Sequence, residues 1–543
     1  MRNRWLPTVL VASVSFLTGG WLLQRALPAE GVVGDAELFQ DVLSQVQATF
    51  VDSLGEDALF RKATDGMLEQ LGDPYTVLLT GEDLQDLTEA TTGNYAGLGI
   101  QIDVRDGWIT VVAPLPDSPA ERLGLQTGDQ IIEVDGVSTE GWSTDRALNT
   151  LRGAPGSLVK IVIRRPGQAD LLPFEIRRAE IHVRSVQPGT LFDGGVGYVA
   201  LNPVSETSGR ELAAEIQALG GKGMKSLVLD LRGNPGGLLE QGVEVTDLFL
   251  DPGQEVVATR GRTRGSTRAF ADRRPQQWPD LPIVVLVDEG SASAAEIIAG
   301  ALQDHDRAVV IGTPTFGKGS VQTLFPLREG AMLKVTTARW YTPSGRSIQR
   351  DAANTEEQVD QVLRDATGVV DSAAAADTVG RPEYTTDGGR TVRGGGGIVP
   401  DLIVRKDTLT GDERAFVTAL GADFAKYRDV LTSYALQLKD RGGPTSEAFA
   451  VTPAMRAEVL RRLQVRGVAM DDSTYARSGR FVTEQIGYEV ARYVFGRPAE
   501  FRRRVADDRQ VARALELLRR APSPKGLLEL TMTTAAEGCG AGC

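Results

Sequence analysis

Three apolar runs in the middle of the chain determine the predicted fold class. Residues 226–231, 281–287 and 308–311 are almost continuously apolar, and each run is followed by glycine or a polar loop. Continuous apolar runs of this length are typical of parallel strands that are buried on both faces. Stretches between the runs, such as residues 294–304, have the apolar spacing of helices. The pattern predicts a layered α/β core with reactive residues gathered at the carboxyl ends of the strands.

Residues 93–182 have a different pattern, in which short alternating strands are separated by glycine and proline turns. Two helical stretches, residues 118–124 and 143–152, interrupt the strands, and Ser143 or Thr144 is suited to cap the second helix. This stretch therefore predicts a β-rich domain with two helices, placed ahead of the core.

Helical segments are predicted at both ends of the folded region. Apolar residues between 35 and 71 fall at helical spacing, which indicates an amphipathic pair that packs on a core or on a second copy of the chain, and we assign residues 35–92 to an N-terminal helical segment. Residues 409–525 return to helical spacing, and we expect residues 526–543 to be a flexible tail.

One segment interrupts the core, which we assign to residues 183–350 and 395–408. Residues 351–394 are polar, rich in Ala, Asp, Thr and Gly, and weakly patterned. Such a composition cannot bury enough apolar surface to form a core, so we predict a mobile insertion.

The first 27 residues have the pattern of a membrane anchor. Arg2 and Arg4 precede an uncharged stretch of 19 residues from Trp5 to Leu23, close to the ~20 residues that span a bilayer. The basic residues at the front predict a cytoplasmic N-terminus and a body that faces the periplasm or the exterior of the cell envelope. We favour a retained anchor, with a cleaved signal and a soluble periplasmic body as the alternative.

Composition narrows the chemistry that the chain can perform. A net charge of -13 disfavours nucleic acid as a partner. The two histidines, His182 and His305, cannot build a multi-histidine metal site, and the two cysteines, Cys539 and Cys543, lie in the last five residues. We therefore predict no metal, no cofactor and no cysteine nucleophile.

A serine stands where the second apolar run meets a helix. Ser293 and Glu296 fit a capping box, in which the serine only satisfies an unpaired helix amide. Small residues on both sides of Ser293 and the free amides of a helix N-terminus also suit a nucleophile that generates an oxyanion. The local pattern leaves both interpretations open.

Lys318 lies in a stretch, residues 312–320, that is similar to a phosphate-binding loop. However, Gly319 stands where Ser or Thr would bind magnesium, and residues 320–327 have the pattern of a strand rather than of a helix. We therefore set nucleotide binding aside. A lysine can take the proton of a serine if burial lowers its pKa and keeps it neutral, and Lys318 lies between two glycines after a buried strand.

Five motifs of the core resemble those of the carboxyl-terminal processing proteases, also called tail-specific proteases. They are residues 230–237, 288–304, 312–327, 337–348 and 396–404. The resemblance implies a crotonase-like α/β protease core that is preceded by a helical segment and a PDZ domain.

The same resemblance assigns roles to residues of this chain. It implies that Ser293 is the nucleophile, that Lys318 is the general base, and that Gln322 orients the lysine. It places the oxyanion hole at the backbone amides of Ala294 and Gly237, with Gly236 as the alternative if the loop length differs.

Residues 93–182 resemble a PDZ domain, on the motifs 95–102, 118–136 and 147–163. The resemblance implies that the turn of Gly97, Leu98, Gly99 and Ile100 binds the terminal carboxylate of a peptide, while the next strand pairs with the peptide.

Together these features predict a serine endopeptidase that recognises protein C-termini and cleaves near them. Its partners are protein or peptide substrates and the membrane, with self-association left open. We also expect Arg152 to couple the PDZ domain to the core, although an ordinary surface arginine is the alternative. The rival hypothesis is a membrane-tethered PDZ binding module with an inactive core.

Overall fold

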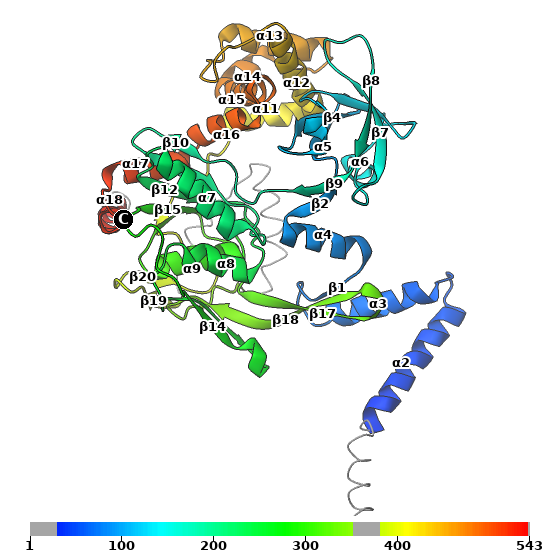
Figure 1. The fold of residues 1–543 in the computed structure, drawn as a ribbon, viewed down its shortest axis with the longest axis vertical. Coiled ribbons are helices and arrows are strands. Elements are labelled where there is room, and N and C mark those ends of the chain that lie inside the picture. Colours follow the sequence, from blue (N-terminus) through cyan, green and yellow to red (C-terminus); the bar gives the residue numbers. More distant parts are fainter. Residues whose placement is uncertain (1–29, 351–380, 541–543) are drawn as a thin grey trace, which may run out of the picture. The chain divides into compact units, whose positions relative to one another are not determined.

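The computed structural model describes residues 30–350 and 381–540, which divide into two units (Figure 1). The smaller unit comprises the chain up to residue 80 together with residues 323–336, and the remainder forms the larger unit. The predicted anchor, residues 1–27, lies outside the described residues. Within the described part, no helix combines the length and apolarity that crossing a membrane requires.

The smaller unit contains two of the predicted N-terminal helices, α2 (Glu30–Thr49) and α3 (Glu56–Glu69). Strand β1 (Val77–Leu79) pairs antiparallel with residues 332–334 at the start of β18 (Met332–Tyr341). A short 3-10 turn, η2 (Arg328–Gly330), precedes β18. Many large apolar side chains of this unit are exposed: Leu38, Phe39, Val42, Phe50, Val51, Phe60, Met67, Leu71, Leu324, Phe325 and Leu327.

The core of the larger unit is a six-stranded sheet that confirms the predicted α/β class. Its order is β10-β11-β12-β15-β16-β21. All neighbours from β11 onward are parallel, and only β10 is antiparallel to its neighbour. The strands are β10 (Thr190–Phe192), β11 (Val196–Ala200), β12 (Ser226–Asp230), β15 (Ile283–Val287), β16 (Val309–Gly312) and β21 (Leu402–Ile403).

Helices cover both faces of this sheet, which explains why its strands are apolar throughout. Helices α7 (Ser208–Gly221), α8 (Leu239–Asp247) and α9 (Ala294–Asp304) pack against one face, with Leu227 and Leu229 of β12. Val228, between these two leucines, points to the other face and packs with α17 (Arg509–Arg520).

Helix α18 (Pro524–Gly540) corrects part of the predicted flexible tail, residues 526–543. Leu527 and Thr531 are buried, and Leu527 packs with the same layer as α17. The side chains of Cys539 and Cys543 lie outside the described part. The apolar residues of this segment are too scattered to show a clear helical period in the sequence. Leu527 and Thr531, one helical turn apart, are nevertheless buried.

A β-hairpin replaces the last part of the predicted mobile insertion, residues 351–394. Strands β19 (Glu383–Thr385) and β20 (Thr391–Arg393) pair antiparallel. Between them, Arg390 binds Asp401 at 2.5 Å and also pairs with Asp306. These ion pairs fix the hairpin to the core, and composition could not reveal them. The rest of the insertion, residues 351–380, lies outside the described part.

A smaller set of strands flanks the core. Strand β13 (Glu255–Gly261) pairs antiparallel with β14 (Arg268–Ala271) and with the second half of β18, and the 3-10 turn η1 (Arg264–Ser266) joins β13 to β14. Strand β17 (Ser320–Pro326) pairs with β18 and not with the core sheet. It lies at the position predicted for a strand, which excludes a helix after the glycine-lysine loop.

The predicted PDZ domain follows helix α4 (Gly81–Thr92). Its sheet has the order β3-β4-β5-β7-β8, so β3 is an edge strand, and a separate pair, β2 with β9, connects the domain to the core. The hydroxyl of Ser143 accepts a hydrogen bond from the amide of Arg146, which confirms the predicted helix cap. The elements are β2 (Asn94–Gly97), β3 (Ile100–Arg105), β4 (Trp108–Pro114), α5 (Pro119–Arg122), β5 (Gln130–Val134), β6 (Val137–Ser138), α6 (Thr144–Leu151), β7 (Leu158–Arg164), β8 (Leu172–Arg177) and β9 (Ala179–His182).

A helical bundle lies between β21 and α17 in the sequence, so the predicted helical region 409–525 is not one body. The bundle has its own core of buried aromatic and aliphatic residues, centred on Phe416, Tyr427 and Tyr475. It is therefore a domain inserted into the protease-like core. Its helices are α11 (Gly411–Leu420), η5 (Gly421–Asp423), α12 (Phe424–Asp440), α13 (Pro453–Val465), α14 (Asp472–Arg477), α15 (Gly479–Val490), the π-helical η6 (Ala491–Phe495) and α16 (Arg497–Ala506).

Because the bundle has a separate core, we expect residues 408–507 to fold when expressed alone. Urea denaturation followed by circular dichroism would show a cooperative transition. Phe416→Ala would lower the free energy of unfolding by about 3–5 kcal/mol, because it opens a cavity among aromatic rings. Val465→Ala, at a side chain that is 74% exposed, is the control, with an expected change within about 0.5 kcal/mol. A non-cooperative transition would contradict an independent domain.

Candidate active site

The candidate residues lie in three loops at one edge of the core sheet. Strands β12, β15 and β16 are parallel neighbours, so their carboxyl ends meet at the same edge. The loop after β12 carries Gly236 and Gly237, the loop after β15 carries Ser293, and the loop after β16 carries Lys318. The structure therefore brings the candidate residues together at the carboxyl ends of neighbouring strands.

Ser293 stands at a strained turn between β15 and α9. Its backbone has φ 52° and ψ -116°, a conformation that side chains other than glycine rarely adopt. The amides of Glu296 and Ile297 close the first turn of α9 by donating to the carbonyl oxygen of Ser293, at 2.9 Å and 3.0 Å. A strained residue on a strand–turn–helix junction is the way in which many hydrolases present a nucleophile.

The neighbouring serine of the same loop has a structural role. Ser291 is fully buried, and its hydroxyl donates to the carbonyl oxygen of Leu231 at 2.8 Å and accepts from the amide of Asp288 at 2.9 Å. These bonds join the loop after β15 to the loop after β12. Ser293 is half-buried, so it is the serine of this loop that faces the open side.

Glu296 joins the serine loop to the lysine loop. Its carboxylate is fully buried and accepts four hydrogen bonds. A capping box predicts only one of them, the bond from the amide of Ser293. The donors are the amide of Ser293 at 2.8 Å, the hydroxyl of Thr315 at 2.5 Å, the amide of Gly317 at 2.7 Å and the amide of Lys318 at 2.9 Å. Burial raises the pKa of Glu296, and the hydrogen bonds oppose that shift.

The shared carboxylate fixes the two candidate catalytic residues close together. The amides of Ser293 and Lys318 bind the same oxygen, Oε2, so their nitrogens lie at most about 5.7 Å apart. Phe316 adds a direct link, because its amide donates to the carbonyl oxygen of Ser291 at 3.0 Å. Trp340, which is buried, donates its indole N–H to the carbonyl oxygen of Lys318 at 3.0 Å.

Lys318 and Gln322 are half-buried, whereas Gly317 and Gly319 on either side of the lysine are buried. Gln322 lies on β17 and donates from Nε2 to the hydroxyl of Ser320 at 3.0 Å. The backbone of the lysine loop is therefore buried and hydrogen-bonded to Glu296 and Trp340, and the side chain of Lys318 is partly exposed at the edge of the sheet.

The glycines after β12 lie against the serine turn. A Cβ atom on Gly236 would come within 2.7 Å of the Cβ atom of Ser293 and 2.9 Å of the amide nitrogen of Ala294. Gly237 has φ 151°, and a Cβ atom there would lie 1.8 Å from the carbonyl oxygen of Val204. Only glycine fits at these two positions, because the close approaches involve backbone atoms or the Cβ atom of Ser293.

The hydrogen bonds of this loop favour Gly237 over Gly236 as an oxyanion donor. The amide of Gly236 already donates to Oδ1 of Asn234 at 2.9 Å. Gly237 is exposed, and across residues 30–350 and 381–540 no acceptor is assigned to its amide or to that of Ala294. The amides of Gly237 and Ala294 are the two that the family resemblance implied as donors of an oxyanion hole.

The chain's C-terminal part supports the same loop. Arg232 binds Asp230 on its own strand and donates from one terminal nitrogen to Asp508 and Gln510, both at 2.7 Å. Asp508 caps α17 by accepting from the amides of Gln510 and Val511. No local pattern predicts this support, because Asp508 and Gln510 lie 276 and 278 residues after Arg232 in the chain.

Neither histidine belongs to the site. His182 contacts Asn94 at 2.8 Å and Glu211 at 2.6 Å, where the β2–β9 pair meets the core. His305 contacts Asp387 and the carbonyl oxygen of Glu255, both at 2.7 Å. In the described residues, no cluster of three or more His, Cys, Asp or Glu side chains could hold a metal ion.

The predicted carboxylate-binding turn of the PDZ domain has its carbonyl groups directed inward. The carbonyl oxygens of Leu98 and Gly99 accept from the amides of Ala120 and Leu115, at 3.1 Å and 2.8 Å. Because a trans peptide points its N–H opposite to its C=O, the amides of Gly99 and Ile100 point away from these partners. Gly97 is buried beneath the ring of Tyr95.

Arg152 lies between this turn and α4. Its guanidinium binds Glu89 at 3.1 Å and lies 5.4 Å from the centre of the Tyr95 ring. Burial raises the pKa of Tyr95, whereas Arg152 and a hydrogen bond from the amide of Gly99 lower it. The expected coupling arginine is thus in contact with the carboxylate-binding turn through Tyr95.

A serine in a strained turn between a strand and a helix is found in many serine hydrolases. Comparison with known proteins narrows this class. Residues 195–359 match Peptidase family S41, and residues 110–165 match the PDZ domain.

Two relatives match this chain over about three quarters of their own length. A carboxy-terminal-processing protease of Bartonella bacilliformis is 40% identical over 329 residues, 60% of this chain and 75% of the relative. The carboxy-terminal processing protease CtpA of Bacillus subtilis is 34% identical over 347 residues, 64% of this chain and 74% of the relative. Among solved structures, the photosystem II D1 C-terminal processing protease is 30% identical, with a TM-score of 0.34, and the match covers 57% of this chain and 89% of that one.

The chain belongs to peptidase family S41 and is a serine peptidase with a PDZ domain. The family that the sequence motifs indicated is therefore confirmed, as are the α/β class of the core and the PDZ domain. The roles of individual residues are taken up below as proposals.

The position of Glu296 predicts a sharp effect of its isosteric amide. All four partners are donors, so in Glu296→Gln the side-chain NH₂ group would face two of them, and the serine and lysine loops would separate. A displacement of about 1 Å can cost about 10²-fold in rate, and we expect a loss of this size in kcat/KM for a peptide substrate.

Glu413→Gln is the matched control. Glu413 also accepts from the amide of its helix N-cap, Thr410, and is buried, but it lies in the helical bundle. We expect it to lower the melting temperature and to leave kcat/KM within about twofold of wild type. Equal kcat/KM in wild type and Glu296→Gln would contradict the role assigned to this carboxylate.

Proposed function

We propose that the chain is an endopeptidase in which Ser293 and Lys318 form a catalytic dyad that cleaves proteins near a C-terminus bound by the PDZ domain. The observation that carries this proposal is the binding of both backbone amides to one oxygen of Glu296. The names of the relatives, which are carboxy-terminal-processing proteases, support the choice of substrate.

The proposed reaction is acyl transfer in two halves. Neutral Lys318 takes the proton of the Ser293 hydroxyl while the serine oxygen bonds to the scissile carbonyl carbon. The amides of Gly237 and Ala294 bind the resulting oxyanion. Collapse of this intermediate breaks the C–N bond, and Lys318 gives its proton to the leaving amine.

Water completes the cycle. Lys318, neutral again, takes a proton from a water molecule whose oxygen attacks the acyl carbon, and the proton then passes to the oxygen of Ser293 as the acid leaves. Gln322, on the strand that follows the lysine loop, positions the lysine amine by hydrogen bonding.

Tail recognition rests on the turn of residues 97–100 and on strand β3. The amides of Gly99 and Ile100 bind the terminal carboxylate, and the open edge of β3 pairs with the preceding residues of the tail. A bound carboxylate shifts the ring of Tyr95, which lies against Gly97 of this turn. Arg152, which contacts Tyr95 and Glu89, transmits this change toward α4.

We further propose that residues 1–27 retain the chain at the inner membrane, with the body facing the periplasm or the exterior. The run from Trp5 to Leu23 between basic residues supports this location. Recovery of the full-length chain only in the soluble fraction would contradict a retained anchor. Exposed apolar side chains on α2 and α3 support self-association of the smaller unit, which sedimentation of the purified chain would test.

Loss of either dyad residue is expected to abolish cleavage. We expect Ser293→Ala and Lys318→Ala each to lower kcat/KM by at least about 10³-fold, because the serine is then absent or its proton is not taken. Mass spectrometry of a model protein with an apolar C-terminus measures the products. A fluorophosphonate probe measures nucleophile reactivity.

The probe separates an enzyme from an inactive scaffold. Labelling of wild type that is lost in Ser293→Ala supports the dyad, whereas Ser291→Ala controls for the neighbouring serine, although it is expected to destabilise the fold. Wild-type chain that binds a tail peptide without labelling or turnover would falsify the proposal.

The tail's carboxylate is expected to matter for binding. Replacing it with an amide removes charge-assisted hydrogen bonds, so KM would rise by about 10- to 100-fold. The same peptide with a blocked N-terminus is the control and should retain its KM. Equal KM values for acid and amide would contradict recognition by the turn of residues 97–100.

Arg152→Gln tests the coupling step. If Arg152 transmits tail binding, the carboxylate should still improve KM in this variant but should no longer raise kcat. A surface arginine would leave both effects of the carboxylate as in wild type.

A further inference from the structure

The inserted helical bundle holds the PDZ domain by the tip of one hairpin. Asp106 lies at the turn between β3 and β4 and accepts from Arg466, at the end of α13, at 2.7 Å. Asp103, on β3, accepts from Arg428 of α12, also at 2.7 Å. Both contacts join segments that lie more than 300 residues apart in the sequence.

Charges at this contact are arranged around Arg466. Its guanidinium lies 2.7 Å from Asp106 and 3.9 Å from Asp429 of α12. Burial raises the pKa of Asp429, and the nearby charge of Asp106 raises it further. Arg466, which contacts both carboxylates, and Arg105 of β3 oppose this shift and allow two carboxylates from different domains to meet.

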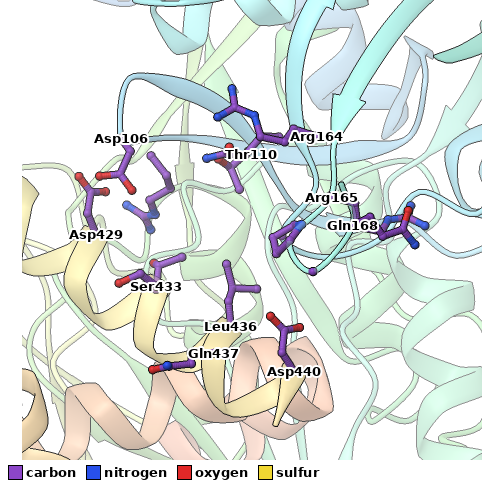
Figure 2. Close-up of a pocket in the computed structure, with 16 residues that line it drawn as sticks. Asp106, Thr110, Arg164, Arg165, Gln168, Asp429, Ser433, Leu436, Gln437 and Asp440 are labelled. Carbon is purple, nitrogen blue, oxygen red and sulfur yellow. The ribbon is translucent and has the colours of Figure 1, made fainter. Parts of the chain in front are cut away.

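Beyond these ion pairs, Leu436 of α12 packs against Gly128, where an added Cβ atom would lie 2.6 Å from the Cδ2 atom of Leu436, and the space beside this point is open. A cavity of about 450 Å³ opens between the PDZ domain and α12 (Figure 2). Figure 2 shows Asp106 and Asp429 at one end of it, with Leu436 and Asp440 of α12 facing the loop that carries Arg165. Exposed ion pairs around a cavity contribute little each and are screened by salt. The hairpin contact can therefore be released without unfolding either domain.

The PDZ domain has a second attachment, at the opposite end of β3. Strands β2 and β9 lead into the core, where the ring of His182 contacts Glu211 of α7 at 2.6 Å. Strand β3 runs from Ile100, at the carboxylate-binding turn, to Arg105, beside the hairpin tip. At about 3.3 Å per residue, these two ends are roughly 17 Å apart. When both the β3–β4 hairpin and the β2–β9 pair are attached, the PDZ domain is fixed in one position. When the hairpin contact is released, the domain can turn about the β2–β9 pair.

We propose that the helical bundle sets the distance between the substrate's C-terminus and the bond that is cut, and that Arg466 and Arg428 are positioning residues for this specificity. The proposal rests on the proposed function, in which the PDZ domain binds the tail. An extended chain covers at most about 3.6 Å per residue, so a shift of the PDZ domain by that distance moves the cut by one residue. A fixed domain gives few cleavage positions, and a released domain gives several.

The test counts cleavage positions. The full chain and its variants are incubated with a model protein that ends in a long unstructured segment with an apolar C-terminus, and the products are identified by intact-mass spectrometry. The variants are Arg466→Gln and Asp106→Asn. Asparagine suits the left-handed backbone of residue 106, where φ is 49°, so the second variant removes charge without adding strain.

We expect wild type to give one or two main products. Each variant should lower the share of the main product by about two- to fivefold, the range that an exposed ion pair can contribute. The double variant should spread the products no further than either single variant, because both changes remove one contact.

Arg461→Gln is the control. Arg461 lies on α13, pairs only with Glu458 of the same helix among the described residues, and does not contact the PDZ domain. Its product pattern should equal that of wild type. Equal rates of fluorophosphonate labelling in all these variants show that the active site is intact.

The outcomes separate this inference from the proposed function. An unchanged product pattern in Arg466→Gln and Asp106→Asn overturns the inference and leaves the peptidase proposal standing. So does a spread that also appears in Arg461→Gln, or that adds up in the double variant. Cleavage that persists in Ser293→Ala overturns the proposed function itself.

Discussion

One buried carboxylate holds the candidate active site together. Glu296 accepts hydrogen bonds from the amides of Ser293, Gly317 and Lys318 and from the hydroxyl of Thr315, which in turn accepts from the amide of Ile398. A charge so deeply buried is costly unless every acceptor position is used. The loops that donate must therefore stay in place. The backbones of Ser293 and Lys318 keep their separation because both donate to the same buried carboxylate.

The parallel sheet makes this arrangement possible and the C-terminal part of the chain completes it. Three neighbouring strands bring three loops to one edge, where Ser291 joins two of them through Leu231 and Asp288. Arg232 then connects the glycine-bearing loop to Asp508 at the start of α17. The geometry of the site thus depends on both helical layers that cover the sheet.

Most of the fold was predictable because its signals are local. Apolar runs predicted the buried strands, and alternation predicted the PDZ sheet. Ser293, Lys318 and the family follow from short motifs. The role of Glu296 was missed because a capping box accounts for its spacing from Ser293, although three of its four partners come from another loop. Arg428 and Asp103 are separated by 325 residues, and no pattern along the chain links them.

The bundle's place in the sequence has a consequence for synthesis. Because it is inserted ahead of α17, a growing chain makes the entire bundle before it makes Asp508, the partner of Arg232, and the helix that covers the second face of the sheet. A nascent polypeptide that has emerged only as far as the bundle carries the serine and lysine loops on a half-covered sheet. The second face of the sheet is therefore covered, and Arg232 is paired with Asp508, only after the bundle has been made.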